Sequence, residues 1–147
     1  MNKKLFFSVI AGTIILSSCE KEDLSSLKQS PINTSFSSQV DEKVYLLSEA
    51  GSITFAITSI SDNRCTAHDF CTDPGDCSVR IKVSNLDNST AESILTIDNS
   101  SEHQTHEVHL KLGKKTYSVY LNNVNPKPFL KSLTTAKEAE FLVQEGK

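Results

Sequence analysis

Residues 52–86 read SITFAITSISDNRCTAHDFCTDPGDCSVRIKVSNL, and this stretch decides the fold. Its two ends alternate apolar and polar residues with a period of two, which is the pattern of a half-buried β-strand. The apolar residues from Ile53 to Ile57 share one face of the first strand, and those from Val79 to Val83 share one face of the second. The stretch therefore predicts two strands that contact the same hydrophobic core, joined by a loop rich in cysteine and aspartate.

Five more short segments have the composition and alternation of strands, and residues typical of turns separate them. They are residues 43–48, 93–97, 106–112, 117–121 and 139–143. Gly113–Lys115 suits a hairpin turn, and Pro126 and Pro128 argue against a central strand where they lie. About seven strands in a chain of 147 residues predict a single all-β domain over residues 40–147. We expect an antiparallel β-sandwich of the immunoglobulin-like kind.

The first 19 residues, MNKKLFFSVIAGTIILSSC, have the features of an exported chain. Lys3 and Lys4 precede an apolar run that is too short to span a membrane as a helix, and small residues follow it. We therefore predict a signal peptide over residues 1–18. The LSSC at the end of this segment resembles a bacterial lipobox. That resemblance implies cleavage before Cys19 and attachment of diacylglycerol and a further acyl chain such as palmitate to this cysteine. The alternative is an ordinary secreted protein in which Cys19 is structural.

Residues 19–39 lie between the signal peptide and the predicted domain. The Glu20–Asp23 charge cluster resembles the export signal of surface lipoproteins, and a solvated charge run explains it equally well. Residues 24–39 are rich in serine and show no sustained apolar period, so we expect residues 19–39 to form a lipidated, flexible tether. Two or more acyl chains hold a protein on a bilayer stably. The expected location is the cell envelope, lipid-anchored in the outer membrane through Cys19, with surface exposure and a periplasmic orientation both open.

The loop and its flanking strands carry a wider resemblance. Their sequence is similar to a pattern of small bacterial β-sandwich lipoproteins of unknown function. In that pattern Asp-Ser-Arg-Cys-Pro is followed by Cys-x-Trp-x-Gly, with five residues between the cysteines. The residues that match are Asp62, Arg64, Cys65, Cys71 and Gly75, and those that depart from it are Asn63, Thr66, Asp73 and Cys77. Residues 117–121 and 124–128 also look like that family's later segments. The resemblance implies a β-sandwich and an envelope location, and it implies no activity.

Three loop cysteines in an exported chain predict one disulfide and one cysteine left over. The resemblance implies that Cys65 and Cys71 form the bond. Cys77 begins the second strand and points inward by parity, so we expect a buried free thiol, with disulfide exchange or an intermolecular bond as alternatives. A cysteine nucleophile needs a histidine partner and a lowered pKa. His68 lies three residues from both Cys65 and Cys71, but we expect no catalysis from this set.

Metal binding is the next class of function to weigh. Four loop aspartates could surround Ca²⁺, but their spacing is not that of an EF-hand. They are Asp62, Asp69, Asp73 and Asp76. His103, His106 and His109 suggest zinc, but residues three apart on a strand point to opposite faces. We therefore expect no metal ion and no cofactor, and we expect Asp62 and Arg64 to form a structural hydrogen-bonded pair.

Charge and motif content narrow the remaining functions. Acidic residues number 18 and basic residues 15, so the chain lacks the excess of basic residues that binding to the nucleic-acid backbone requires. The sequence also lacks the pattern of a catalytic triad, a paired-carboxylate site or a glycine-rich phosphate loop. We therefore predict a non-catalytic binding or structural module that meets an unknown envelope or extracellular protein through its loop. The candidate binding residues are Asp62, Arg64, His68, Asp69, Asp73 and Asp76. The alternatives are a Ca²⁺ or Zn²⁺ protein and an inhibitor of extracellular proteases that presents a rigid, stapled loop.

Overall fold

The computed structural model describes residues 27–49, 51–65, 75–98, 106–127 and 136–146. Nine strands lie within these residues. They are β1 (Lys28–Pro31), β2 (Ser35–Gln39), β3 (Lys43–Ser48), β4 (Gly51–Asp62), β5 (Asp76–Asn85), β6 (Thr90–Asp98), β7 (His106–Leu112), β8 (Lys115–Asn125) and β9 (Glu138–Glu145). No helix long and apolar enough to cross a membrane occurs among the described residues.

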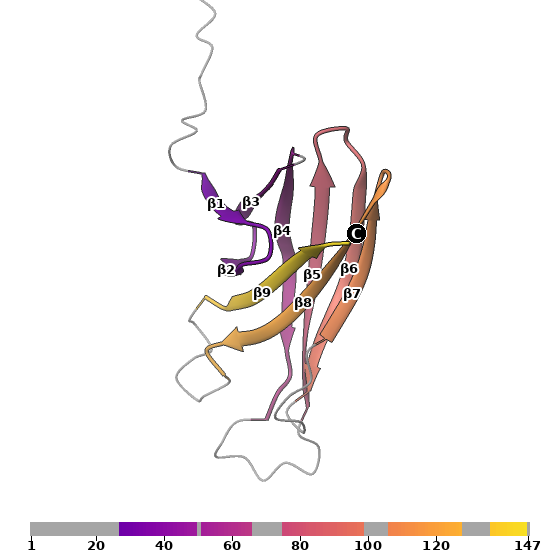
Figure 1. Ribbon diagram of the computed structural model, residues 1–147. Coiled ribbons are helices and arrows are strands. Elements are labelled where there is room, and N and C mark those ends of the chain that lie inside the picture. Colours follow the sequence, from indigo (N-terminus) through magenta and orange to yellow (C-terminus); the bar gives the residue numbers. More distant parts are fainter. Residues whose placement is uncertain (1–26, 50, 66–74, 99–105, 128–135, 147) are drawn as a thin grey trace, which may run out of the picture.

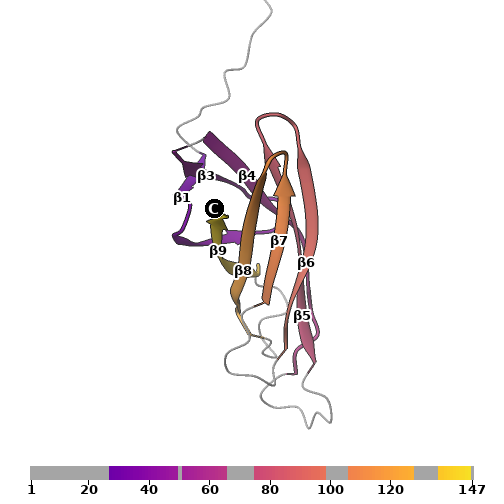
Figure 2. The same cartoon turned by 45° about the vertical axis from the view of Figure 1, so that its right-hand side comes forward.

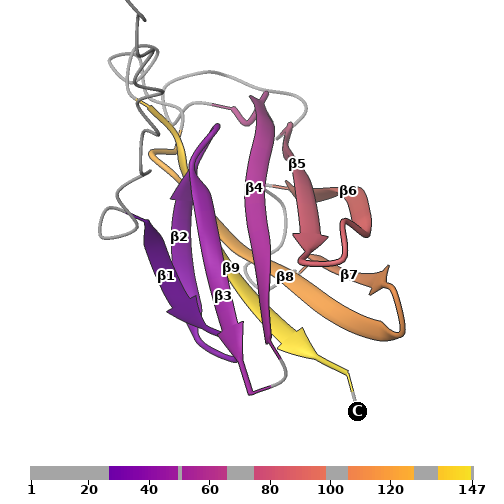
Figure 3. The same cartoon turned by 90° about the horizontal axis from the view of Figure 1, so that it is seen from above.

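The strands form two sheets that lie one in front of the other (Figure 1). Sheet A has the order β1-β3-β4-β5-β6, and sheet B has the order β2-β9-β8-β7. Figure 2 shows the same two layers from another side, and Figure 3 shows from above that the strands of sheet B cross those of sheet A at an angle. The prediction of an all-β domain is therefore confirmed, and the two layers are arranged like a sandwich.

The core lies between the sheets because each strand turns every second side chain inward. The inward residues of β4 and β5 are buried, as their alternation predicted. Three phenylalanine rings contact one another across the core. The ring centroid of Phe55 on sheet A lies 5.1 Å from that of Phe36 and 4.7 Å from that of Phe141, both on sheet B. Aromatic side chains bury large apolar areas, so these rings are a main contact between the layers.

All seven predicted strands are present. The bounds of β3 and β7 agree with the predicted residues 43–48 and 106–112, and the other five strands differ from prediction by a few residues at their ends. The hairpin predicted at Gly113–Lys115 joins β7 to β8. Gly113 has a φ of 62°, in the left-handed region that glycine adopts without a steric penalty.

The flexible tether predicted over residues 19–39 is wrong from residue 28 onward. Residues 28–31 form β1, which pairs with β3, and residues 35–39 form β2, which pairs with β9. A serine-rich segment can join a sheet because the main-chain hydrogen bonds of a strand do not depend on its side chains. Phe36 is the large apolar side chain that β2 buries in the core. The domain therefore includes residues from Lys28 onward, instead of beginning at residue 40.

The expectation of a purely antiparallel sandwich is wrong at one edge. β1 runs parallel to β3, whereas β3, β4, β5 and β6 pair antiparallel, as do the strands of sheet B. The chain crosses from sheet A to sheet B directly after β1. Ile32 N–H donates to the Leu47 carbonyl at 2.9 Å in sheet A, and Asn33 N–H donates to the Val143 carbonyl at 2.8 Å in sheet B. The N-terminal segment is therefore bonded to both layers.

Antiparallel pairing also fixes where the connections leave the sandwich. It brings the end of β4 beside the start of β5, and the end of β8 beside the start of β9. Both pairs of strand ends lie toward the lower end of the molecule in Figures 1 and 2. This end carries the candidate site.

Candidate functional site

A buried polar cluster lies where β4 ends. Arg64 donates from Nε to Asp62 Oδ1 at 2.8 Å and from Nη2 to Asp62 Oδ2 at 2.8 Å. The two side chains therefore form a bidentate ion pair. The main-chain N–H of Arg64 also donates to Oδ1 at 3.2 Å. Both side chains are nearly fully buried, with 3% of Arg64 and 2% of Asp62 exposed. The predicted structural pair is therefore confirmed.

Lys137 and two carbonyl groups complete this cluster. Lys137 Nζ donates to Asp62 Oδ2 at 2.6 Å and to the Pro126 carbonyl oxygen at 3.0 Å. Arg64 Nη2 donates to the Val124 carbonyl oxygen at 2.9 Å. We call Asp62, Arg64 and Lys137, with the carbonyls of Val124 and Pro126, the Asp62 network. It ties the end of β4 in sheet A to the end of β8 and the start of β9 in sheet B.

Sequence reasoning missed Lys137. This residue lies 75 positions from Asp62 along the chain, so no spacing pattern connects the two. Only the order of strands, which places the start of β9 next to the end of β8, brings its ammonium group to the carboxylate. A lysine just before a strand is otherwise an ordinary surface residue.

The network fixes the charge of Asp62. Burial alone raises the pKa of this carboxyl, but hydrogen bonds from Arg64 and Lys137 outweigh burial and hold the pKa below its ordinary value. The hydrogen bond with Asp62 in turn raises the pKa of Arg64. Each carboxylate oxygen accepts two N–H groups. The carboxylate therefore stays ionised with its acceptor positions occupied, which suits an anchor and not a catalytic acid or base.

Acid should destabilise the fold through this carboxyl. The folded pKa of Asp62 lies below its unfolded value, so its ion pairs stabilise the chain above the unfolded pKa, and this contribution is lost as the pH falls through the folded pKa. We expect the urea midpoint of the parent to fall between about pH 5 and pH 2 more steeply than that of Asp62→Asn. Glu92→Gln removes an exposed carboxylate and should keep the parental slope. Equal slopes for the parent and Asp62→Asn would contradict the prediction.

Gly75 closes the base of the loop that follows Arg64. Its φ of 64° is in the left-handed region, and a Cβ placed on it would lie 2.1 Å from the carbonyl oxygen of Asn63. The Asn63 N–H also donates to the Asp76 carbonyl at 2.8 Å. The two chain segments at the loop base are therefore in direct main-chain contact, which only glycine at position 75 allows.

The two described cysteines have different environments. Cys77 is a fully buried free thiol on β5, as predicted. Burial, followed by the nearby charge of Asp62, raises the pKa of this thiol to about 11. This thiol is therefore protonated at neutral pH, whereas a nucleophilic cysteine needs a lowered pKa. Cys65 is not a free thiol. The bond between Cys65 and Cys71 stays a prediction, because Cys71 lies outside the described residues.

Three of the predicted binding residues, His68, Asp69 and Asp73, also lie outside the described residues, so their position relative to Asp62 stays a prediction. Asp76 is described. It begins β5, and its Oδ2 lies 3.4 Å from the Ser78 hydroxyl, which donates to it. The described part of the chain therefore brings together Asp62 and Arg64, with Asp76 on the neighbouring strand.

The two described histidines, His106 and His109, lie on opposite faces of β7. His106 shares the inward side of β7 with Leu110, and its Nε2 is buried without a hydrogen-bond partner. His109 lies on the outer face of the same strand, and His103 lies outside the described residues. The described residues contain no group of three or more histidine, cysteine, aspartate or glutamate side chains that could hold a metal ion.

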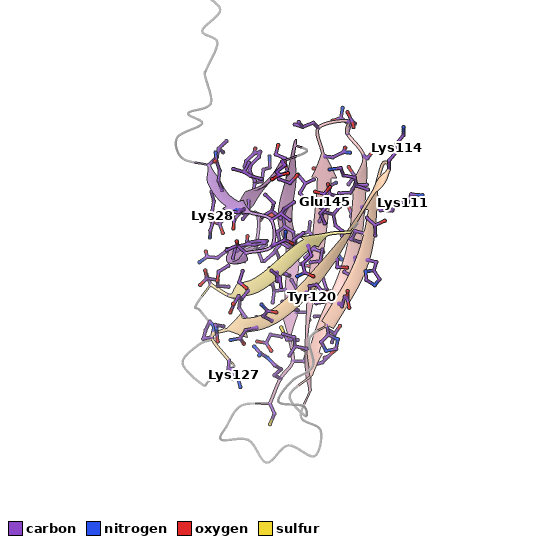
Figure 4. All side chains as sticks on the ribbon, viewed as in Figure 1. Lys28, Lys111, Lys114, Tyr120, Lys127 and Glu145 are labelled. Atoms are coloured by element: carbon purple, nitrogen blue, oxygen red, sulfur yellow. The ribbon has the colours of Figure 1, made fainter. Side chains whose placement is uncertain are left out.

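A second polar cluster, missed from the sequence, lies on the outer face of sheet B. His109 Nδ1 is 2.8 Å from the Ser118 hydroxyl and 3.6 Å from Glu107 Oε1. A hydrogen bond from Tyr120, labelled in Figure 4, is the main cause that lowers the pKa of Glu107. Ser118 and Glu107 both lie next to Nδ1 of His109. In a Ser-His-Asp triad, by contrast, the serine and the carboxylate contact different nitrogens of the imidazole ring. The cluster could have been found by extending the hairpin at Gly113, which pairs Glu107 with Tyr120.

Comparisons with known proteins find no matching family model, no matching curated protein and no matching solved structure.

Proposed function

We propose that this chain is a lipid-anchored, non-catalytic binding module of the bacterial cell envelope. The segment between Arg64 and Gly75 is the part that contacts its partner. The observation that carries this proposal is the Asp62 network, which holds the start of that segment against sheet B through buried hydrogen bonds. A segment with fixed ends loses less conformational entropy on binding, so affinity increases without any added contact.

The chemistry of the described groups supports binding over catalysis. Asp62 and Arg64 use their polar atoms on each other, on Lys137 and on main-chain carbonyls. Cys77 is buried and protonated at neutral pH. These side chains therefore stabilise the loop base, and the groups left to meet a partner are those that the sequence places in the loop, namely His68, Asp69 and Asp73.

The remaining parts of the proposal come from the sequence. The charged start, apolar run and LSSC support export, cleavage before Cys19 and acylation of that residue. The resemblance of the loop to small envelope lipoproteins supports an outer-membrane location, an immunoglobulin-like sandwich and a bond between Cys65 and Cys71. A bond of that kind closes a short ring and adds to the rigidity of the proposed binding segment.

Site-specific cross-linking tests the binding segment. A photo-crosslinking amino acid placed at His68 in the full chain should give a discrete protein adduct in intact cells after illumination. The same amino acid placed at Glu92, on the exposed outer face of sheet A, is the matched control and should give none. Absence of an adduct at position 68, or equal adducts at both positions, would contradict the proposal.

Two further measurements test the anchor and the metal-free state. Cys19→Ala should abolish incorporation of a palmitate analogue and move the chain from the membrane fraction to the soluble fraction. Native mass of the mature chain should be the same with and without chelator. A bound Ca²⁺ or Zn²⁺ that chelator removes would overturn the metal-free module and favour a metal protein.

A further inference from the structure

The end of the sandwich opposite the Asp62 network carries an exposed leucine. Leu86 lies in the turn between β5 and β6, and 78% of its surface is exposed. The turn is well held, because Asn85 Oδ1 accepts the N–H groups of Asp87 at 3.1 Å and Ser89 at 2.9 Å. A turn fixed by these hydrogen bonds thus displays an apolar side chain to solvent.

A groove with a basic rim lies beside this leucine. It has a volume of about 630 Å³ and is open to solvent. Its lining includes Leu86, Leu112, Tyr117, Asp87, Lys114 and Lys115. Lys111 is exposed on the strand that leads into the same hairpin. An exposed leucine next to Lys111 and Lys114 complements a surface that is negatively charged outside and apolar beneath.

The first strand of the domain runs toward this same end, because Pro31 at the end of β1 pairs with Leu47 beside the β3–β4 turn. Ile32 and Asn33, which follow β1, line a cavity with Glu145, and Glu145 pairs with Lys115 in the groove. Figure 4 shows Lys28, Glu145 and Lys114 in the upper part of the molecule and Lys127 at its lower end. Because β1 begins at Lys28, only residues 20–27 separate the domain from Cys19. Eight residues span at most about 29 Å, so the anchor keeps this end near the bilayer.

We propose that Leu86 and the lysines of the β7–β8 hairpin contact an anionic lipid surface. The sandwich then stands end-on, with the Asp62 network and the partner-binding segment directed away from the bilayer. Leu86 enters the boundary between headgroups and acyl chains, while Lys111 and Lys114 meet lipid phosphates and Lys115 stays paired with Glu145. This inference rests on the proposed lipid anchor, which supplies the attachment, and it adds the orientation of the domain and the residues that set it.

Fluorescence quenching on vesicles tests the orientation. The mature, lipidated chain is reconstituted into vesicles that contain phosphatidylglycerol and a quencher on the lipid headgroup. A fluorophore is attached at Thr90→Cys, beside the Leu86 turn, or at Ser61→Cys, near the Asp62 network. Background labelling is low because Cys77 is buried and Cys65 is not a free thiol. We expect strong quenching at position 90 and little at position 61.

Matched variants separate the contribution of Leu86 to the orientation from that of the lysines. Leu86→Ser should shift the orientation equilibrium by about tenfold or more, as expected for losing one buried leucine, and so reduce the quenching at position 90. Ile94→Ser removes an apolar side chain that is 50% exposed on the outer face of sheet A and should change nothing. The double variant Lys111→Gln/Lys114→Gln should shift the orientation equilibrium by up to about thirtyfold, and so reduce the difference in quenching between positions 90 and 61. The double variant Lys43→Gln/Arg80→Gln should leave this difference unchanged.

Two results would overturn the inference, and they differ from a failure of the anchor. Chains that float with the vesicles but show equal quenching at both positions have an anchor and no preferred orientation. If the difference in quenching between positions 90 and 61 is unchanged on neutral phosphatidylcholine vesicles, the lysines do not contribute to the orientation. Chains that do not float with vesicles at all lack the anchor, which overturns the proposed function together with the orientation.

Discussion

Arg64→Met should lower the free energy of unfolding by about 3–5 kcal/mol, the usual cost of removing one partner from a buried ion pair. The change deletes both side-chain hydrogen bonds to Asp62 and the one to the Val124 carbonyl. It leaves a carboxylate that is 2% exposed with Lys137 as its remaining cation. Urea unfolding of the mature chain, followed by circular dichroism, measures the loss.

Arg80→Met is the matched control, because Arg80 lies on β5 with its side chain exposed. Surface charges of this kind contribute about 0–1 kcal/mol. A loss from Arg64→Met that is no larger than the loss from Arg80→Met would show that the Asp62 network is not what holds the loop base. The network would then no longer support a binding segment with fixed ends.

Gly75→Ala should cost between about 2 and 5 kcal/mol, since it combines two penalties. A residue with a Cβ is strained at the left-handed φ of 64°, and the new Cβ would overlap the Asn63 carbonyl oxygen at 2.1 Å. The overlap is with main chain, which can move only if the loop base separates. We therefore expect Gly75→Ala also to reduce the cross-linking expected at His68.

Gly113→Ala isolates the backbone part of this penalty, the cost of a left-handed φ. Gly113 has nearly the same φ, 62°, but a Cβ there meets nothing closer than 3.7 Å. It should therefore lose only the roughly 1–2 kcal/mol of a left-handed residue. The same urea measurement on both variants gives the cost of the contact with Asn63 as their difference. A difference near zero would mean that the loop base yields to a methyl group, and that it is not rigid.

Much of the fold could be predicted because its strands have inward residues that are strongly apolar. The alternation of β4 and β5 indicated the core face of each, and parity predicted that Cys77 points inward. The Asp62–Arg64 pair was also predictable, since two residues of opposite charge lie two positions apart at a strand end.

The parts that could not be predicted depend on contacts that sequence patterns do not record. β1 and β2 are rich in serine, and their place in the sheets comes from main-chain pairing with β3 and β9. Lys137 reaches Asp62 because β8 and β9 lie side by side in sheet B. Leu86 lies in a turn of polar residues, and the sequence alone does not distinguish it from other loop residues. The fold is needed to show that it lies at the end of the sandwich opposite the Asp62 network.

The pairing of β2 with β9 has a consequence for biogenesis. Phe36 pairs with Phe141 across these strands, and residues 40–137, about two thirds of the chain, lie between them. Contacts between such distant residues form late, because closing a long loop must precede them. Sheet B therefore cannot close until the last strand has been synthesised. If the proposed export takes place, the domain completes its fold only after β9 has crossed the membrane, and a copy that ends before Glu138 lacks the Phe141 ring that packs on Phe36.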